Sequence, residues 1–194
     1  MTFTFTRADL EAERDTAAAQ AEERPGKAKL QRLGRAHRWL DDEDGARAAF
    51  RAGAEYMQAN VFAKGRSENA TGWLEYGLLL RGAGELDAAA EYFARALDVV
   101  DEADTVRRAQ LRYLLDQPPG PIPDAPVWEQ GLNALASGAD VEAARATVEY
   151  ALSVERGLPS YTAPTMTLWD LLEATYPPEL SHTEMLRRSG FLAG

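Results

Sequence analysis

The 194-residue sequence contains no cysteine and only two histidines, His37 and His182. Without cysteine the chain forms no disulfide, no thiolate zinc site and no cysteine nucleophile, which fits a reducing cytoplasm. No apolar run approaches the ~20 residues that a membrane helix requires. The opening stretch MTFTFTRADL also lacks the apolar core of a signal peptide. We therefore expect a cytoplasmic protein.

Several patterns that would indicate catalysis or cofactor binding are missing as well. The acidic segment DDEDG at 41–45 does not fit a calcium loop, which would need an acidic residue at Leu40 and a glutamate at Arg51. The glycines of YGLLLRGAGE are followed by no Gly-Lys-Ser/Thr and form no phosphate-binding loop. His37 falls where we expect a packing role, and His182 is expected to be exposed. We infer that the chain is not an enzyme and binds no metal or cofactor.

Charge argues against a nucleic-acid partner. The chain has 31 acidic and 21 basic side chains, a net charge of −10, and such a chain is repelled by a phosphate backbone. Basic residues do gather on one predicted helix, at Lys27, Lys29, Arg32, Arg35 and Arg38. No aromatic residues interleave with them in the way that base stacking requires.

Leucines, alanines and aromatic residues recur at three- and four-residue spacing, and β-branched alternation is nearly absent, so the sequence predicts an all-α fold. We expect a first helix from a capping box at Thr6 and Asp9 to about residue 24, with Asp41 or Asp42 capping the third helix. Further helices are predicted at 27–40, 43–58, 68–82, 85–100, 102–116, 126–137, 140–156, 165–175 and 182–189. A loop is expected at 59–68. The last helix begins with a capping box of Ser181 and Glu184 and ends at a left-handed Gly190.

One stretch, WLEYGLLLRGAGELDAAAEYFARAL at 73–97, predicts a helical hairpin. Trp73, Gly77 and Leu80 share one face of a helix, and Ala89 and Phe93 share one face of the next. Two helices pack at ~8–10 Å only where small side chains leave room. We therefore expect Gly77 to face Ala89, with large side chains above and below.

This pattern resembles the tetratricopeptide repeat, in which Trp-x2-Leu-Gly-x2-Tyr precedes Ala-x3-Phe. The copy at Trp73-x2-Tyr76-Gly77-x2-Leu80 continues with Ala89-x3-Phe93. A second copy reads Leu30-x2-Leu33-Gly34-x2-His37, then Ala46-x3-Phe50. A third, poorer copy begins near Trp128, with Gly131, Ala134 and Gly138 followed by Ala144-x3-Val148.

The resemblance implies stacked antiparallel hairpins in a right-handed superhelix, an α-solenoid, with extra C-terminal helices. We expect one continuous domain: a capping helix at 1–26, hairpins and an additional helix at 27–116, a proline-rich connector at 117–126, and a degenerate hairpin with C-terminal helices at 127–194.

The resemblance also implies that a peptide or partner protein binds the concave face. Helical spacing places nine residues there: Gln31, Arg35, Arg38, Leu74, Leu78, Arg81, Trp128, Leu132 and Leu135. The face is basic at one end and apolar at the other, which suits an acidic and apolar segment. Alternatively, Leu74, Leu78 and Trp128 pack against the chain's own C-terminal helices, and the arginines form a solvated helix face.

Three functions follow from these observations. The first is an interaction scaffold: an adaptor, chaperone or regulator that holds a partner segment. The second is an acidic inhibitor, such as an immunity protein, that blocks a basic partner, since complementary charge speeds association. The third is a small-ligand sensor or an enzyme with a pocket near Trp128 and Trp169.

Overall fold

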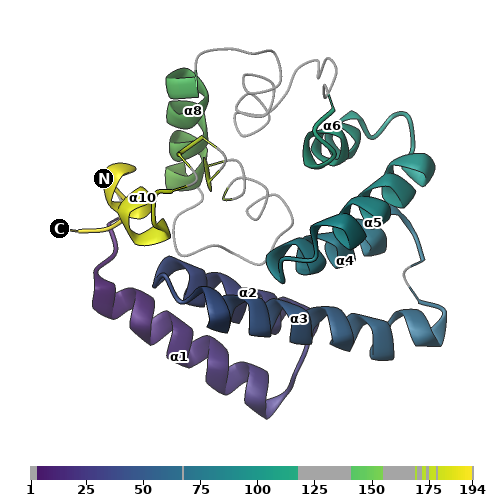
Figure 1. Ribbon diagram of the computed structural model, residues 1–194, viewed down its shortest axis with the longest axis horizontal. Helices are drawn as coiled ribbons and strands as arrows, with labels where there is room; N and C mark the ends of the chain where they lie inside the picture. The colour runs from purple at the N-terminus through teal and green to yellow at the C-terminus, as the bar shows by residue number, and fades with distance from the viewer. Residues whose placement is uncertain are drawn as a thin grey trace. The chain divides into compact units, whose positions relative to one another are not determined.

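A computed structural model describes residues 4–66, 68–117, 141–154, 169, 172–173, 175–177 and 179–193 (Figure 1). The chain divides into two compact units. The first, which we call the hairpin unit, comprises residues 4–99 and 182–194. The second, which we call the inserted unit, comprises 100–181 together with 1–3.

The described part of the chain is helical, as predicted. In the hairpin unit the elements are α1 (Arg7–Glu23), α2 (Lys27–Trp39), α3 (Glu43–Asn60), the 3-10 helix η1 (Phe62–Lys64), α4 (Ala70–Gly82), α5 (Leu86–Val99) and α10 (His182–Arg188). In the inserted unit they are α6 (Thr105–Leu114) and α8 (Val141–Val154). Among the described residues the one β-type pairing is an isolated bridge between Phe5 and Leu192.

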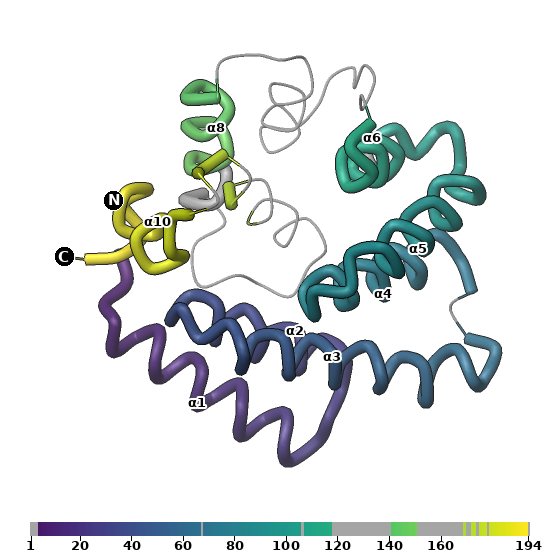
Figure 2. Tube along the Cα trace, in the orientation of Figure 1, coloured from purple at the N-terminus to yellow at the C-terminus, as the bar shows by residue number. Residues whose placement is uncertain are grey.

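Neighbouring helices of the hairpin unit pack in pairs. α2 packs on α3 and α4 packs on α5, while α1 packs on α2 and α3 packs on α4 (Figure 2). The predicted bounds differ from these helices by a few residues at most, except that α3 continues into the expected loop, where η1 follows it. The helix predicted at 126–137 and nearly all of the 117–126 connector lie outside the described residues, as does most of 165–175.

Side chains cap the helices where short polar residues precede them. The capping box of Thr6 and Asp9 is complete, with both reciprocal hydrogen bonds present. The Oδ1 atom of Asp42 accepts the amide of Gly45 at 3.0 Å and so caps α3. Asn69, for which the sequence analysis predicted no cap, caps α4 by accepting the amide of Gly72. At the end of α10, Gly190 has the predicted left-handed conformation, with φ of 78°.

The same glycine–phenylalanine contact closes both hairpins. A Cβ atom on Gly77 would lie 2.5 Å from Cε1 of Phe93, and one on Gly34 would lie 2.8 Å from the ring of Phe50. Such distances leave no space for a side chain larger than hydrogen. In each hairpin the phenylalanine follows the glycine by 16 residues (50 − 34 and 93 − 77). The nearest atoms to Gly77 therefore belong to Phe93 rather than to Ala89, which is buried nearby in α5.

Phe50 also joins the first hairpin to the second. A Cβ atom on Gly82, at the end of α4, would lie 2.5 Å from Cγ of Phe50. One turn earlier on α4, the side chain of Leu79 would meet a Cβ atom on Gly53 of α3 at 2.8 Å. Small residues on both helices thus let α3 and α4 approach closely.

Candidate partner-binding surface

Two side-chain contacts show that α2 and α4 run side by side in the same direction. Lys27 at the start of α2 forms an ion pair with Glu75 in the middle of α4. Arg38 at the end of α2 donates from Nη2 to the carbonyl oxygen of Gly82 at the end of α4, at 3.2 Å. The start of α2 thus reaches the middle of α4, and the end of α2 reaches the end of α4, so the two helices run in the same direction.

Six of the predicted partner-binding residues lie on this pair of helices, and we call them the α2–α4 set. They are Gln31, Arg35 and Arg38 on α2, and Leu74, Leu78 and Arg81 on α4. The other three predicted residues, Trp128, Leu132 and Leu135, lie outside the described residues.

The arginines of α2 are not a solvated face. Arg35 is only 6% exposed, so the expectation of solvation is wrong for this residue. The side chain of Arg38 is 15% exposed, and its guanidinium carbon lies 5.1 Å from the centre of the Phe50 ring. Its Nε also lies 3.5 Å from Oε2 of Glu43. Arg38 therefore contacts residues of both hairpins where they meet. Helical spacing alone did not indicate this role.

The remaining basic residues of α2 also form contacts within the hairpin unit. Arg32 binds both carboxylate oxygens of Glu13 on α1, with Nη2 to Oε2 at 2.6 Å. Lys29 donates from Nζ to the carbonyl oxygen of Gln20 at 3.0 Å. With the pair of Lys27 and Glu75, these contacts tie α2 to its neighbours α1 and α4. Most basic side chains of the predicted basic helix therefore take part in contacts within the hairpin unit.

The three residues of α4 in this set share a face that turns toward neither α3 nor α5. Gly77 faces α5, whereas Leu79 and Gly82 face α3. An α-helix has 3.6 residues per turn. This spacing directs Leu74, Leu78 and Arg81 between the α3 side and the α5 side of the helix. Leu74 and Leu78 are 3% and 5% exposed. This burial agrees with the alternative in which the leucines belong to the core.

Arg81 is less buried than Arg35, which is 6% exposed. Its side chain is half-buried, and its Nη1 atom is shielded from solvent without a hydrogen-bond acceptor in the described part of the chain. A buried guanidinium N–H without an acceptor costs free energy, because it loses hydration without compensation. Because Nη1 is out of reach of solvent, an anionic partner would have to contact the exposed remainder of the Arg81 side chain.

The turn between α2 and α3 holds the histidine of the first hairpin. Nδ1 of His37 lies 2.7 Å from Oδ2 of Asp42, the residue that caps α3. His37 thus supports the turn through this polar contact. Among the described residues no group of three or more histidine, aspartate or glutamate side chains could hold a metal ion.

We expect stability to depend on the ionisation of Asp42 at low pH. The amide of Gly45 and then the side chain of His37 lower the pKa of Asp42 below its ordinary value of 3.8. The carboxylate therefore stabilises the fold fully above that ordinary value, and this contribution is lost as pH falls through the lowered pKa. Urea unfolding of Asp42→Ala and wild type should differ by about 1 kcal/mol at pH 7, and the difference should shrink below pH 4.

The exposed Asp44→Ala, changed in the first turn of the same helix, is the control. It removes an equal charge without removing the cap. A difference for Asp42→Ala that stays constant from pH 7 to pH 3 would contradict the assignment.

The inserted unit contains a polar cluster that sequence reasoning missed. Arg145 on α8 donates from Nη2 to the carbonyl oxygen of Thr175 at 2.5 Å, and its guanidinium carbon lies 4.0 Å from the centre of the Tyr176 ring. The hydroxyl of Tyr176 donates to Oε1 of Glu149 at 3.1 Å. Burial raises the pKa of Glu149 despite this hydrogen bond. About 30 residues separate the partners, and no local pattern connects them.

Acidic side chains form a stripe on the outer face of α5. Asp87, Glu91 and Asp98 are exposed, and they recur at four and seven residues, which places them on one side of the helix. Within the described part of the chain none of the three has an ion-pair partner. These three carboxylates place part of the chain's excess negative charge on one face of α5.

Comparison with models of protein families, with curated proteins and with solved structures finds no match. None of the described helices combines the length and the apolar character needed to cross a membrane.

Proposed function

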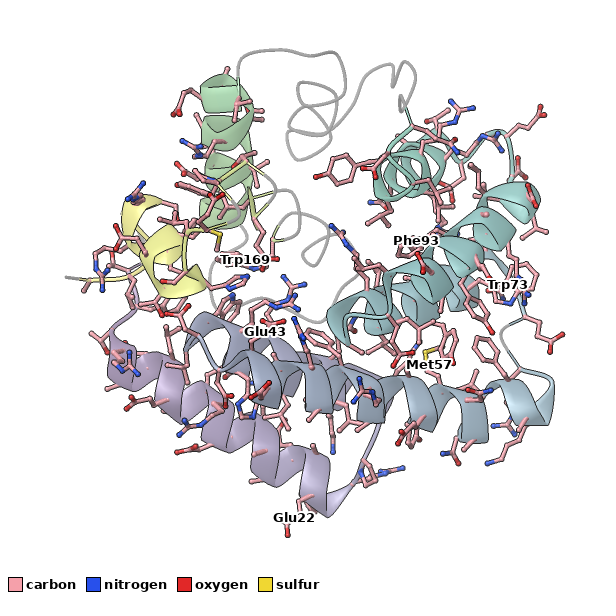
Figure 3. All side chains as sticks on the ribbon, in the orientation of Figure 1. Glu22, Glu43, Met57, Trp73, Phe93 and Trp169 are labelled. Atoms are coloured by element: carbon pink, nitrogen blue, oxygen red, sulfur yellow. The ribbon has the colours of Figure 1, made fainter. Side chains whose placement is uncertain are left out.

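We propose that the chain is an interaction scaffold of the tetratricopeptide type, which acts in the cytoplasm as an adaptor, chaperone or regulator. The observation that carries this proposal is the repeated seam: Gly34 with Phe50 in one hairpin, and Gly77 with Phe93 in the next (Figure 3 labels Phe93). The parallel arrangement of α2 and α4 supports it, because the first helices of stacked hairpins line one continuous surface.

The proposed ligand is an acidic segment of a partner protein that also offers apolar side chains. The basis for the acidic part is the positive charge of Arg81, whose side chain is only partly buried. A carboxylate of the partner would pair with the exposed part of this side chain, and a charge-assisted hydrogen bond is about twice as strong as a neutral one. Gln31 on α2 would provide a neighbouring polar contact, while Leu74 and Leu78 support the surface from the core.

Charge reversal at Arg81 tests this surface. We expect Arg81→Glu to lower recovery of the bound partner at least ten-fold in affinity purification from the native host, because it replaces an attractive contact by repulsion of the acidic segment. Recovery is measured by quantitative mass spectrometry against wild-type chain as bait.

The matched control is Arg66→Glu, which makes the same charge change at an exposed arginine in the loop before α4. Circular dichroism of both variants must show unchanged helix content at the assay temperature. Equal recovery with Arg81→Glu and Arg66→Glu would show that the α2–α4 set does not bind the partner.

A second candidate function is an acidic inhibitor that covers a basic partner, and the stripe of Asp87, Glu91 and Asp98 favours it. The two candidates use different surfaces. A variant with Asn, Gln and Asn at these positions should slow association and weaken its salt dependence if the stripe binds. It should leave partner capture unchanged if the α2–α4 set binds.

A further inference from the structure

The chain leaves the hairpin unit after α5 and returns to it only at α10. Residues 100–181 belong to the inserted unit, and residues 182–194 complete the hairpin unit. We call residues 182–193 the latch. The chain therefore crosses between the units at the end of α5 and at the start of the latch, in addition to the crossing between residues 3 and 4.

Two hydrogen bonds fix the start of the latch to the turn between α2 and α3. The hydroxyl of Thr183 donates to the carbonyl oxygen of Trp39 at 2.9 Å, and the amide of Thr183 donates to Oδ1 of Asp41 at 3.1 Å. Asp41 has a left-handed backbone with φ of 59°. It thus serves as a cap for α10 from a position 142 residues earlier in the chain.

The other end of the latch pairs with residues just before α1. The amide of Phe5 donates to the carbonyl oxygen of Phe191, and the amide of Ala193 donates to the carbonyl oxygen of Phe5, both at 2.7 Å. Between these polar ends, Met185, Leu186 and Leu192 are buried. The latch therefore has a specific seat, formed by Phe5 and by the turn that contains Trp39 and Asp41.

The helix of the latch is too short to be stable without this seat. α10 has seven residues, and isolated helices below about 12–15 residues are marginal in water. Two of its ion pairs, from Arg187 and Arg188 to Glu184, lie within the helix itself. Its order must come from the buried side chains, from Thr183 and from the bridge to Phe5, all of which are lost together when the latch leaves.

We propose that the latch detaches from its seat as one cooperative unit while α2 to α5 remain folded. Local openings of this kind occur in segments that few contacts hold. Opening exposes a seat that fits a segment of the same chemistry: a threonine in the first turn, buried Met and Leu, and a Gly-Phe-Leu end. This inference does not depend on the proposed function of the α2–α4 set.

Hydrogen exchange of the full chain tests the opening. Amides of residues 185–193 should exchange at least ten-fold faster than interior amides of α4. Thr183→Val, which removes the hydroxyl but keeps the shape, should speed exchange in the latch about five-fold, because a buried hydrogen bond is lost. It should leave exchange in α4 unchanged.

The matched control is Ser189→Ala, because the hydroxyl of Ser189 bonds only to carbonyl oxygens of α10 itself, of Met185 at 2.7 Å and of Leu186 at 3.3 Å. It should not reproduce the effect of Thr183→Val on the bridge amides of Phe5 and Ala193. Equal protection in latch and α4, with both changed alike by Thr183→Val, would show that the latch opens only with global unfolding and would overturn the proposal.

A peptide experiment tests the seat. A fluorescent peptide of residues 181–194 should bind the full-length Thr183→Val chain about five-fold more tightly than the full-length wild type, because the resident latch competes less well. Fluorescence anisotropy gives both affinities. Binding that is equal for the two chains, or absent from both at millimolar chain, would show that the peptide and the latch share no seat.

Discussion

Replacing Phe50 with alanine is expected to lower the free energy of unfolding of the hairpin unit by about 4 kcal/mol, within the range for large buried aromatics. The ring fills the space against Gly34 of α2 and Gly82 of α4, and the guanidinium of Arg38 lies over it. Its loss leaves a cavity where the two hairpins meet, and it removes the surface that holds Arg38 across α4.

Urea titration followed by hydrogen exchange of the amides of α2 to α5 measures this loss within the hairpin unit. Phe62→Ala is the matched control, because Phe62 is half-exposed in η1 and contacts Tyr76 edge-to-face with ring centres 5.2 Å apart. We expect it to cost about 1 kcal/mol, the value of such an aromatic pair. Similar losses for the two variants would contradict the role of Phe50 as the joint between hairpins.

Introducing valine at Gly77 is expected to cost about 3 kcal/mol, at the upper end for overpacking of a close contact. A Cβ atom there would lie 2.5 Å from Cε1 and 2.7 Å from Cδ1 of Phe93. Either the ring must leave its position or α4 and α5 must separate. The better helix propensity of valine over glycine, a few tenths of a kcal/mol, is too small to compensate.

A double-mutant cycle with Phe93→Leu identifies the cause. Leucine occupies less of the space beside Gly77, so the cost of Gly77→Val should fall by about 1 kcal/mol in the Phe93→Leu background. Gly26→Ala is the control, because a Cβ atom there meets nothing within 4 Å, and its cost should stay near 0.5 kcal/mol. A cost for Gly77→Val that is independent of residue 93 would refute the predicted seam.

The hairpins were predictable because their signals are local. Apolar spacing of three and four residues located α2 to α5 within a few residues, and Thr6, Asp42 and Gly190 marked ends that the structure confirms. The need for a small residue at position 77 was equally visible. Which side chain fills the space beside it was not, because the ring of Phe93 and the methyl of Ala89 lie on the same face of α5, and only packing selects between them.

The candidate surface was less predictable, because its properties depend on neighbours far along the chain. Helical spacing places Gln31, Arg35 and Arg81 on their helices, but it does not show whether each is covered. The burial of Arg35 and the neutralisation of Arg32 by Glu13 follow from tertiary packing. The series of basic residues in the sequence therefore overstated the positive charge that α2 presents to solvent.

Sequence alone determined that this protein is helical, lacks thiol chemistry, and pairs α4 with α5 through a glycine, since each of these depends on residue types within one or two turns. Only the tertiary structure decided that Arg38 reaches α4, that Arg81 keeps a shielded nitrogen, and that Asp41 caps a helix 142 residues away. The reason is physical: hydrogen bonds and burial join groups by distance in space, and side-chain periodicity records only distance along a helix.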